Sequence, residues 1–209
     1  MPTISAICSM AVSDNGQGAS KEQLRKLQAP LKLEKLSEHG FVGHLAEPEQ
    51  TSDKAVIVIM GGEQSLLPGI KIAERFADYG FIGLAVSLFG AEGLPDSPDR
   101  CPLEMFENAV KYLKSERKIA HISTYGQSMG SIFAVLTAQY IGNIENVIMV
   151  SPTHVPFEGV AKDNKHMTGH SVAIEQSERE IINWSERDRS GRTGNDTYGT
   201  GGRKTSKGK

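Results

Sequence analysis

The sequence predicts an α/β fold in which helices cover a mostly parallel sheet. Three observations predict it: apolar runs that are typical of buried strands, stretches between them with apolar residues at helical spacing, and short connections. With 209 residues, of which 38% are hydrophobic, the chain is long enough to form one domain with a substantial core.

The predicted strands lie between residues 33 and 171. The first, "FVGHLAEP", alternates apolar and polar residues, which indicates a half-buried strand near an edge of the sheet. The second, "KAVIVIMGG", is a β-branched run ending in glycines and is typical of a strand buried on both faces. Three further strands are predicted at "FIGLAVSLFG", "IAHISTYG" and "IENVIMVSP". We therefore expect five or six strands.

Three helices are predicted between these strands. The first follows Pro68 and stops at Gly80. The second opens with Pro102 as its first residue, a favoured place for proline. The third runs from about residue 129 to 141 and is followed by Gly142. One apolar stripe of the second helix is made of Leu103, Phe106, Val110 and Leu113.

The composition divides the chain into three zones. Residues 1–30 are polar and predict a flexible leader, and residues 31–173 form the predicted domain. Residues 174–209 are rich in Arg, Gly, Ser and Thr, and they have too little apolar surface to offset the entropy of ordering, so we expect a disordered tail. The change after residue 173 is abrupt, and a shifted reading frame or a truncated gene is its leading explanation.

Charge and cysteine content exclude several classes of protein. The net charge of −2 gives no argument for binding to nucleic acid or to an anionic membrane. The basic end of the tail is interpreted as a solvated segment. No apolar run approaches the roughly 18 residues that a membrane span needs. Two cysteines make no disulfide framework, and no basic stretch precedes the apolar start around Cys8. We expect a cytoplasmic protein, and its oligomeric state stays open.

One motif indicates chemistry. Gly126, Gln127, Ser128, Met129 and Gly130 give the pattern G-x-S-x-G between a predicted buried strand and a predicted helix. This setting is that of a nucleophile elbow, whose sharp turn lifts the serine hydroxyl above the sheet and requires neighbours without side chains. The alternative is an ordinary turn in which Ser128 caps the following helix. The flanking glycines favour the nucleophile.

A serine nucleophile also needs hydrogen-bond donors for the oxyanion that forms on its substrate. One donor is expected from the backbone N–H of Met129, the residue after the serine. The second is expected from the loop after the second strand, where Gly61 and Gly62 stand. An ordinary turn, without any role in binding an oxyanion, would explain those glycines equally well.

The stretch "LPGIKIAERFADYGFIGLAVSLFGAEGLPDSPDRCPLEMFENAVKYL", with "YGQSMGS" and "VIMVSPTHVPFEG" after it, carries a family resemblance. It closely resembles the C-terminal catalytic domain of acyl-CoA thioester hydrolases and bile acid-CoA:amino acid N-acyltransferases, over about residues 35–173. The resemblance implies an α/β-hydrolase fold, incomplete in this chain, and acyl transfer through a covalent acyl-enzyme. Ser128 matches the family nucleophile, which is cysteine in the amidating branch, so serine favours hydrolysis.

The sequence offers no convincing base and acid for that serine. The family places them after two further strands, and no histidine follows residue 173. His154, just past the last strand, is the candidate base, although an exposed loop histidine is the commoner interpretation. Asp163 with His166 or His170 has the right order but no strand between acid and base. The two histidines are four residues apart, a spacing that would suit a metal on a helix, but no metal site is predicted.

The leading functional hypothesis is a serine hydrolase of the acyl-CoA thioesterase type, impaired by the loss of its acid and base. The substrate would be a small acyl-CoA or an ester, and no cofactor is implied because coenzyme A enters as part of the substrate. Two alternatives stay open. One is a catalytically silent fragment that acts as a binding module or pseudoenzyme, and the other is a carboxylesterase or dienelactone-type hydrolase.

Overall fold

A computed structural model describes residues 39–62, 65–153, 158–163 and 166–174. Its centre is a five-stranded sheet in the order β1-β3-β2-β5-β6. The strand β1 pairs antiparallel with β3, and the other neighbours are parallel, so the predicted mostly parallel sheet is confirmed. The five strands are β1 Gly43–Ala46, β2 Lys54–Ile59, β3 Ile82–Val86, β5 His121–Gln127 and β6 Asn146–Val150.

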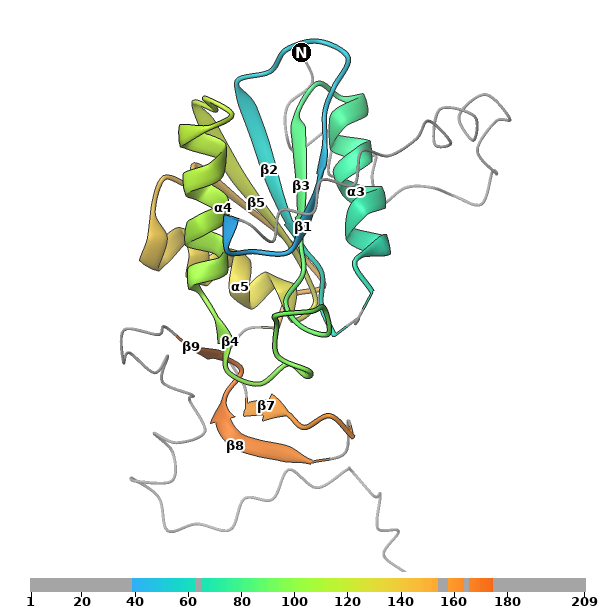
Figure 1. The fold of residues 1–209 in the computed structure, drawn as a ribbon, viewed down its shortest axis with the longest axis vertical. Coiled ribbons are helices and arrows are strands. Elements are labelled where there is room, and N and C mark those ends of the chain that lie inside the picture. The colour runs from blue at the N-terminus through green and yellow to red at the C-terminus, as the bar shows by residue number, and fades with distance from the viewer. Residues whose placement is uncertain (1–38, 63–64, 154–157, 164–165, 175–209) are drawn as a thin grey trace, which may run out of the picture.

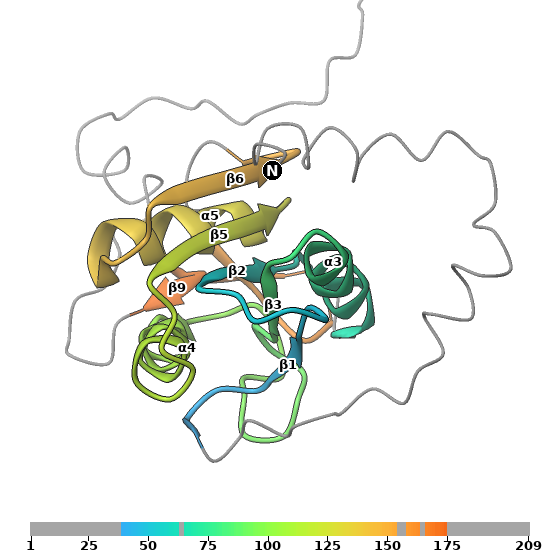
Figure 2. The ribbon, with the colours of Figure 1, turned by 90° about the horizontal axis from the view of Figure 1, so that it is seen from above.

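Helices cover both faces of this sheet (Figure 1, Figure 2). One face packs against α3 (Leu67–Asp78), and the other packs against α4 (Glu104–Ser115) and α5 (Gly130–Leu136). The central strand β2 alternates between the two layers: Ile57 and Ile59 join the core under α4 and α5, whereas Val56 and Val58 join the core under α3. This alternation explains why its sequence is apolar throughout.

The two edges of the sheet differ. At one edge, all four residues of β1 are buried, so the prediction of an edge position is confirmed and that of a half-buried strand is wrong. At the other edge, β6 pairs with β5 alone within the described residues, and Met149 is 48% exposed there. None of the helices in the described residues is long and apolar enough to cross a lipid bilayer.

One helix boundary differs from the prediction, and another helix changes type within its predicted range. Pro102 belongs to the two-residue strand β4 (Cys101–Pro102), and α4 begins only at Glu104, because the segment before it pairs with another strand. The predicted apolar stripe of α4 is nevertheless buried. The helix α5 ends at Leu136 and continues as a wider π-helical turn, η2 (Thr137–Ile141), before Gly142 at φ 73°.

A small β layer lies beyond the carboxyl ends of the parallel strands (Figure 1). It consists of the antiparallel pair β7 (Glu158–Val160) and β8 (Met167–Ser171), followed by β9 (Ala173–Ile174), which pairs with β4. Because β4 directly precedes α4, which runs back along the sheet, this pairing holds the hairpin at the carboxyl edge. The predicted leader and tail, residues 1–30 and 174–209, lie outside the described residues except for Ile174.

Candidate functional site

The turn between β5 and α5 presents Ser128 at the carboxyl edge of the sheet. Its backbone has φ 53°, a left-handed conformation that non-glycine residues rarely adopt, and the residue is exposed. The helix that follows has Met129 as its N-cap and no side-chain cap hydrogen bond. Within the described residues the Ser128 hydroxyl forms no hydrogen bond, so its side chain does not close off the helix.

The glycines around Ser128 are required by close packing. A Cβ atom at Gly126 would lie 2.4 Å from the carbonyl oxygen of Gly130. A Cβ atom at Gly130 would lie 2.2 Å from the carbonyl oxygen of Ile59, at the end of β2. Because both obstacles are backbone atoms, the close packing of α5 against the sheet requires glycine at both positions.

Hydrogen bonds hold the Ser128 backbone on both sides. Its N–H donates to the carbonyl oxygen of Val150, the last residue of β6, at 2.9 Å. Its carbonyl accepts the N–H of Ser131 at 3.0 Å and also the Ser131 hydroxyl. Sequence reasoning missed both Val150 and Ser131, since neither belongs to the G-x-S-x-G pattern.

The predicted oxyanion donors lie beside the same turn. A Cβ atom at Gly61 would be 3.0 Å from Ser128 Cβ and 3.4 Å from the Met129 nitrogen, so the loop after β2 contacts the serine turn. A Cβ atom at Gly62 would meet no atom of the described residues within 4 Å. Among the described residues, the N–H groups of Met129, Gly61 and Gly62 donate to no protein acceptor. The three donors are therefore available to a ligand.

A small hollow adjoins these donors. Its walls come from the ends of β2 and β3 and from the start of α3, and they include Gly61, Ser65 and Ser87. The Ser87 hydroxyl already donates to the carbonyl oxygen of Phe89, and the Ser65 hydroxyl accepts the N–H of Leu67. The remaining wall is apolar: Met60, Leu66, Val86 and Leu88. The hollow is therefore lined mainly by apolar side chains.

The histidines of the sequence do not converge on Ser128 in the described residues. His154, the candidate base, lies outside them. His166 pairs with Asp163, its Nδ1 atom 2.5 Å from Asp163 Oδ2, and both side chains are largely exposed. His170 lies on the strand β8, so the pair four residues apart has no helical geometry. The described residues contain no group of three metal-ligating side chains.

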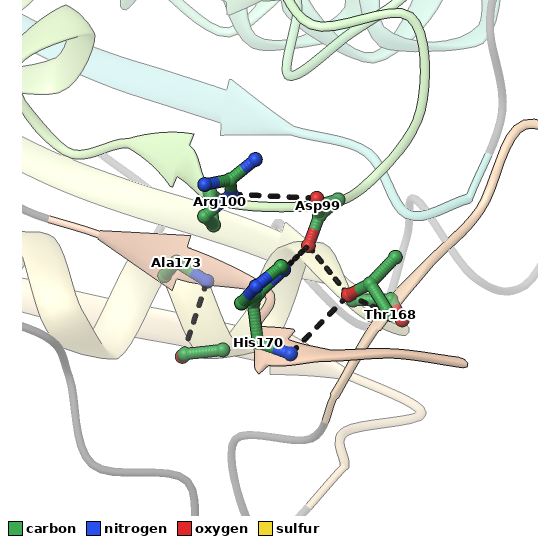
Figure 3. Close-up of polar contacts among 7 residues, drawn as sticks. Asp99, Arg100, Thr168, His170 and Ala173 are labelled. Carbon is green, nitrogen blue, oxygen red and sulfur yellow. Dashed lines mark hydrogen bonds and ion pairs between the residues drawn. The ribbon is translucent and has the colours of Figure 1, made fainter.

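A second polar cluster, which sequence reasoning missed, lies between the hairpin and the loop before β4 (Figure 3). The Thr168 hydroxyl donates to Asp99 Oδ1 at 2.6 Å, and His170 Nδ1 lies 3.7 Å from the same oxygen. On the other carboxylate oxygen, Arg100 Nε lies 3.5 Å away. Since the Asp99 side chain is only 16% exposed, the cluster fixes β8 against this loop. No sequence signal pairs residues this far apart.

Cys101 is the cysteine among the described residues, and its burial controls the reactivity of its thiol. Cys101 is fully buried, and burial, with the nearby Asp99 charge as a smaller cause, raises the pKa of its thiol to about 12. A thiol in this state is inert at neutral pH. A cysteine nucleophile, which the resemblance associates with the amidating branch, is therefore not supplied by Cys101.

Comparison with known proteins supports the resemblance. Residues 101–191 match the family described as BAAT / Acyl-CoA thioester hydrolase C terminal, a range that contains Ser128 and runs past residue 173. A curated relative, acyl-coenzyme A amino acid N-acyltransferase 2 of Mus musculus, is 29% identical over 107 residues, which are 50% of this chain. The chain spans only 26% of that relative's length.

Two solved structures match part of this chain. TT1662 from Thermus thermophilus has a TM-score of 0.47 at 18% identity, covering 57% of this chain and 56% of its own. A soluble variant of the monoglyceride lipase of Saccharomyces cerevisiae has a TM-score of 0.46 at 18% identity, covering 56% of this chain and 42% of its own.

Proposed function

We propose that this chain hydrolyses acyl-CoA thioesters, because residues 101–191 match the family described as BAAT / Acyl-CoA thioester hydrolase C terminal and the five-stranded sheet is mostly parallel. In this proposal Ser128 is the nucleophile and forms a transient acyl-serine. The observation that carries it is the exposed Ser128 at φ 53°, whose side chain caps no helix and stands beside unpaired backbone donors.

The chemistry proceeds in two steps. Ser128 Oγ attacks the thioester carbonyl carbon and forms a C–O bond, its proton passes to a base, and the C–S bond breaks to release coenzyme A as the thiol. Water then attacks the acyl-serine, which releases the carboxylic acid and restores the hydroxyl. In both steps the N–H groups of Met129 and of Gly61 or Gly62 stabilise the charge on the carbonyl oxygen.

The proposed base is His154, which is not among the described residues. Its place in the chain supports this role, because Val150 accepts the Ser128 N–H at 2.9 Å and His154 follows only four residues later. Four residues span at most about 14 Å when fully extended, so the short separation from Val150 in the sequence is compatible with this role. Residual activity without an acid partner is expected from the oxyanion donors alone.

A fluorophosphonate probe with a mass-spectrometric readout tests the nucleophile. Wild-type protein should be labelled on Ser128, and Ser128→Ala should lose the label while keeping the wild-type circular dichroism spectrum. Ser65→Ala is the matched control, because Ser65 is also exposed and lies in the neighbouring hollow. Labelling that is equal in wild type and Ser128→Ala refutes the proposal.

A substrate comparison separates the remaining functions. Hydrolysis of acyl-CoA faster than that of simple esters of the same acyl chain supports the thioesterase, and the reverse order indicates a carboxylesterase. The silent fragment is favoured by one observation, that no base contacts the Ser128 hydroxyl among the described residues. The silent fragment is established if folded wild-type protein neither takes the probe nor hydrolyses either substrate.

A further inference from the structure

The conformation of Ser128 has to be held in place. A non-glycine residue at φ 53° is in an unfavourable region of the backbone map, and such a residue persists only when its surroundings enforce the geometry. Val150 holds the N–H of Ser128, and Ser131 holds its carbonyl. The two contacts come from different elements, the edge strand β6 and the first turn of α5.

The contact with Ser131 is double. Both its N–H and its hydroxyl donate to the carbonyl oxygen of Ser128. The Ser131 side chain is 1% exposed, so this hydroxyl is shielded from water. A serine in the first turn of a helix often bonds a preceding carbonyl, and by itself that bond has only a local role. Here the acceptor belongs to the strained residue.

The Ser128 carbonyl and the Met129 N–H belong to one planar peptide unit. In a trans peptide the two groups point in opposite directions, so fixing the carbonyl also fixes the direction of the N–H. The Ser131 donors draw the carbonyl toward α5, and the Met129 nitrogen lies on the side of the Gly61 loop. Hydrogen bonds to the carbonyl also polarise the peptide and strengthen the N–H as a donor.

We propose that Ser131 is a positioning residue that aims the Met129 N–H at the reacting carbonyl oxygen by anchoring the Ser128–Met129 peptide. The inference rests on the proposed function, because it assigns a role in the same acyl-transfer step. Ser131 does not touch the substrate. Its hydroxyl acts through the rigid peptide, and its loss leaves the helix with one bond fewer to that peptide.

The test compares Ser131→Ala with Thr137→Val. Thr137 is fully buried, and its hydroxyl donates to the carbonyl oxygen of Phe133 at 2.7 Å, so Thr137→Val removes an equivalent bond in the same helical segment without touching Ser128. In fluorophosphonate labelling, Ser131→Ala should lower the maximal inactivation rate by roughly tenfold with an unchanged inhibition constant, since small misplacements of catalytic groups have effects of this order. Thr137→Val should label like wild type.

Crystal structures of the wild type and Ser131→Ala supply the second readout. The Ser128–Met129 peptide should rotate in the variant, and this readout decides the inference even if wild-type protein takes no probe, a result that would refute only the proposed function. An unrotated peptide in Ser131→Ala overturns the inference. So does a labelling rate in Ser131→Ala equal to that of Thr137→Val when the wild type is reactive.

Discussion

Replacing Gly61 by alanine adds one methyl group beside the exposed serine. That Cβ atom would lie 3.0 Å from Ser128 Cβ, 3.1 Å from the Gln127 carbonyl oxygen and 3.4 Å from the Met129 nitrogen. Two carbon atoms in good contact are about 3.5–4.0 Å apart, so the loop and the serine turn must separate by about 0.5 Å. Such a shift is small for the fold, and we expect a loss of stability of about 1–2 kcal/mol, within the usual cost of overpacking.

The effect on chemistry should be larger than the effect on stability. The methyl group partly covers the Met129 N–H and displaces the donor loop, and loss of one oxyanion donor lowers kcat by about 100- to 1,000-fold. We therefore expect Gly61→Ala to reduce acyl-CoA hydrolysis and fluorophosphonate labelling by about 10- to 100-fold, because the donor is displaced rather than removed.

Gly62→Ala is the matched control for this experiment. It adds the same methyl group one residue later, keeps the Gly62 N–H, and meets no atom of the described residues within 4 Å. Stopped assays of thiol release, with urea unfolding in parallel, measure both quantities on both variants. The reasoning is refuted if Gly61→Ala reacts like wild type, or if Gly62→Ala loses as much activity as Gly61→Ala.

Three further predictions concern the framework. Gly130→Ala should destabilise the fold by at least about 3 kcal/mol in urea unfolding, since its Cβ would lie 2.2 Å from a backbone oxygen. Gly142→Ala, in open space at φ 73°, should cost about 1 kcal/mol. Equal losses of stability in the two variants would contradict this prediction. Burial lowers the pKa of His44 from 6.5, and neither ring nitrogen has a hydrogen-bond partner among the described residues. The unfolded chain therefore binds the proton more readily, and stability should fall as the pH drops below 6.5, less so in His44→Leu; equal slopes of unfolding free energy against pH would exclude His44 as the cause. Native Cys101, with its pKa near 12, should resist iodoacetamide at pH 8 and react once urea unfolds the chain, as peptide mass spectrometry would show; rapid native alkylation would disprove its burial.

Strands and helices were predictable where the local pattern is strong. The apolar run of β2, the glycine stop after α3 and the stripe of α4 all lie where periodicity placed them, because each reflects burial against one layer. The same reasoning failed at Pro102. Its preference for the start of a helix was overridden by the pairing of β4 with β9, a contact between segments about 70 residues apart.

The candidate site was predictable only in part. The pattern G-x-S-x-G identified Ser128, and the glycines around it are those that the close approach of α5 to β2 demands. The roles of Val150 and Ser131 were not predictable, because the motif says nothing about which groups hold the backbone of its serine. The cluster around Asp99 was missed for the same reason, since Thr168 approaches it from a distant hairpin.

The sequence by itself determined the order of the five sheet strands and of the three helices, the place of the exposed serine and the family that the chain resembles, because these depend on neighbouring residues and on fixed spacings. Only the tertiary structure decided which backbone donors stand beside that serine, which groups hold it at a positive φ, and where the hairpin lies against the carboxyl edge of the sheet. Such contacts join residues that are far apart in the chain, and no local periodicity encodes them.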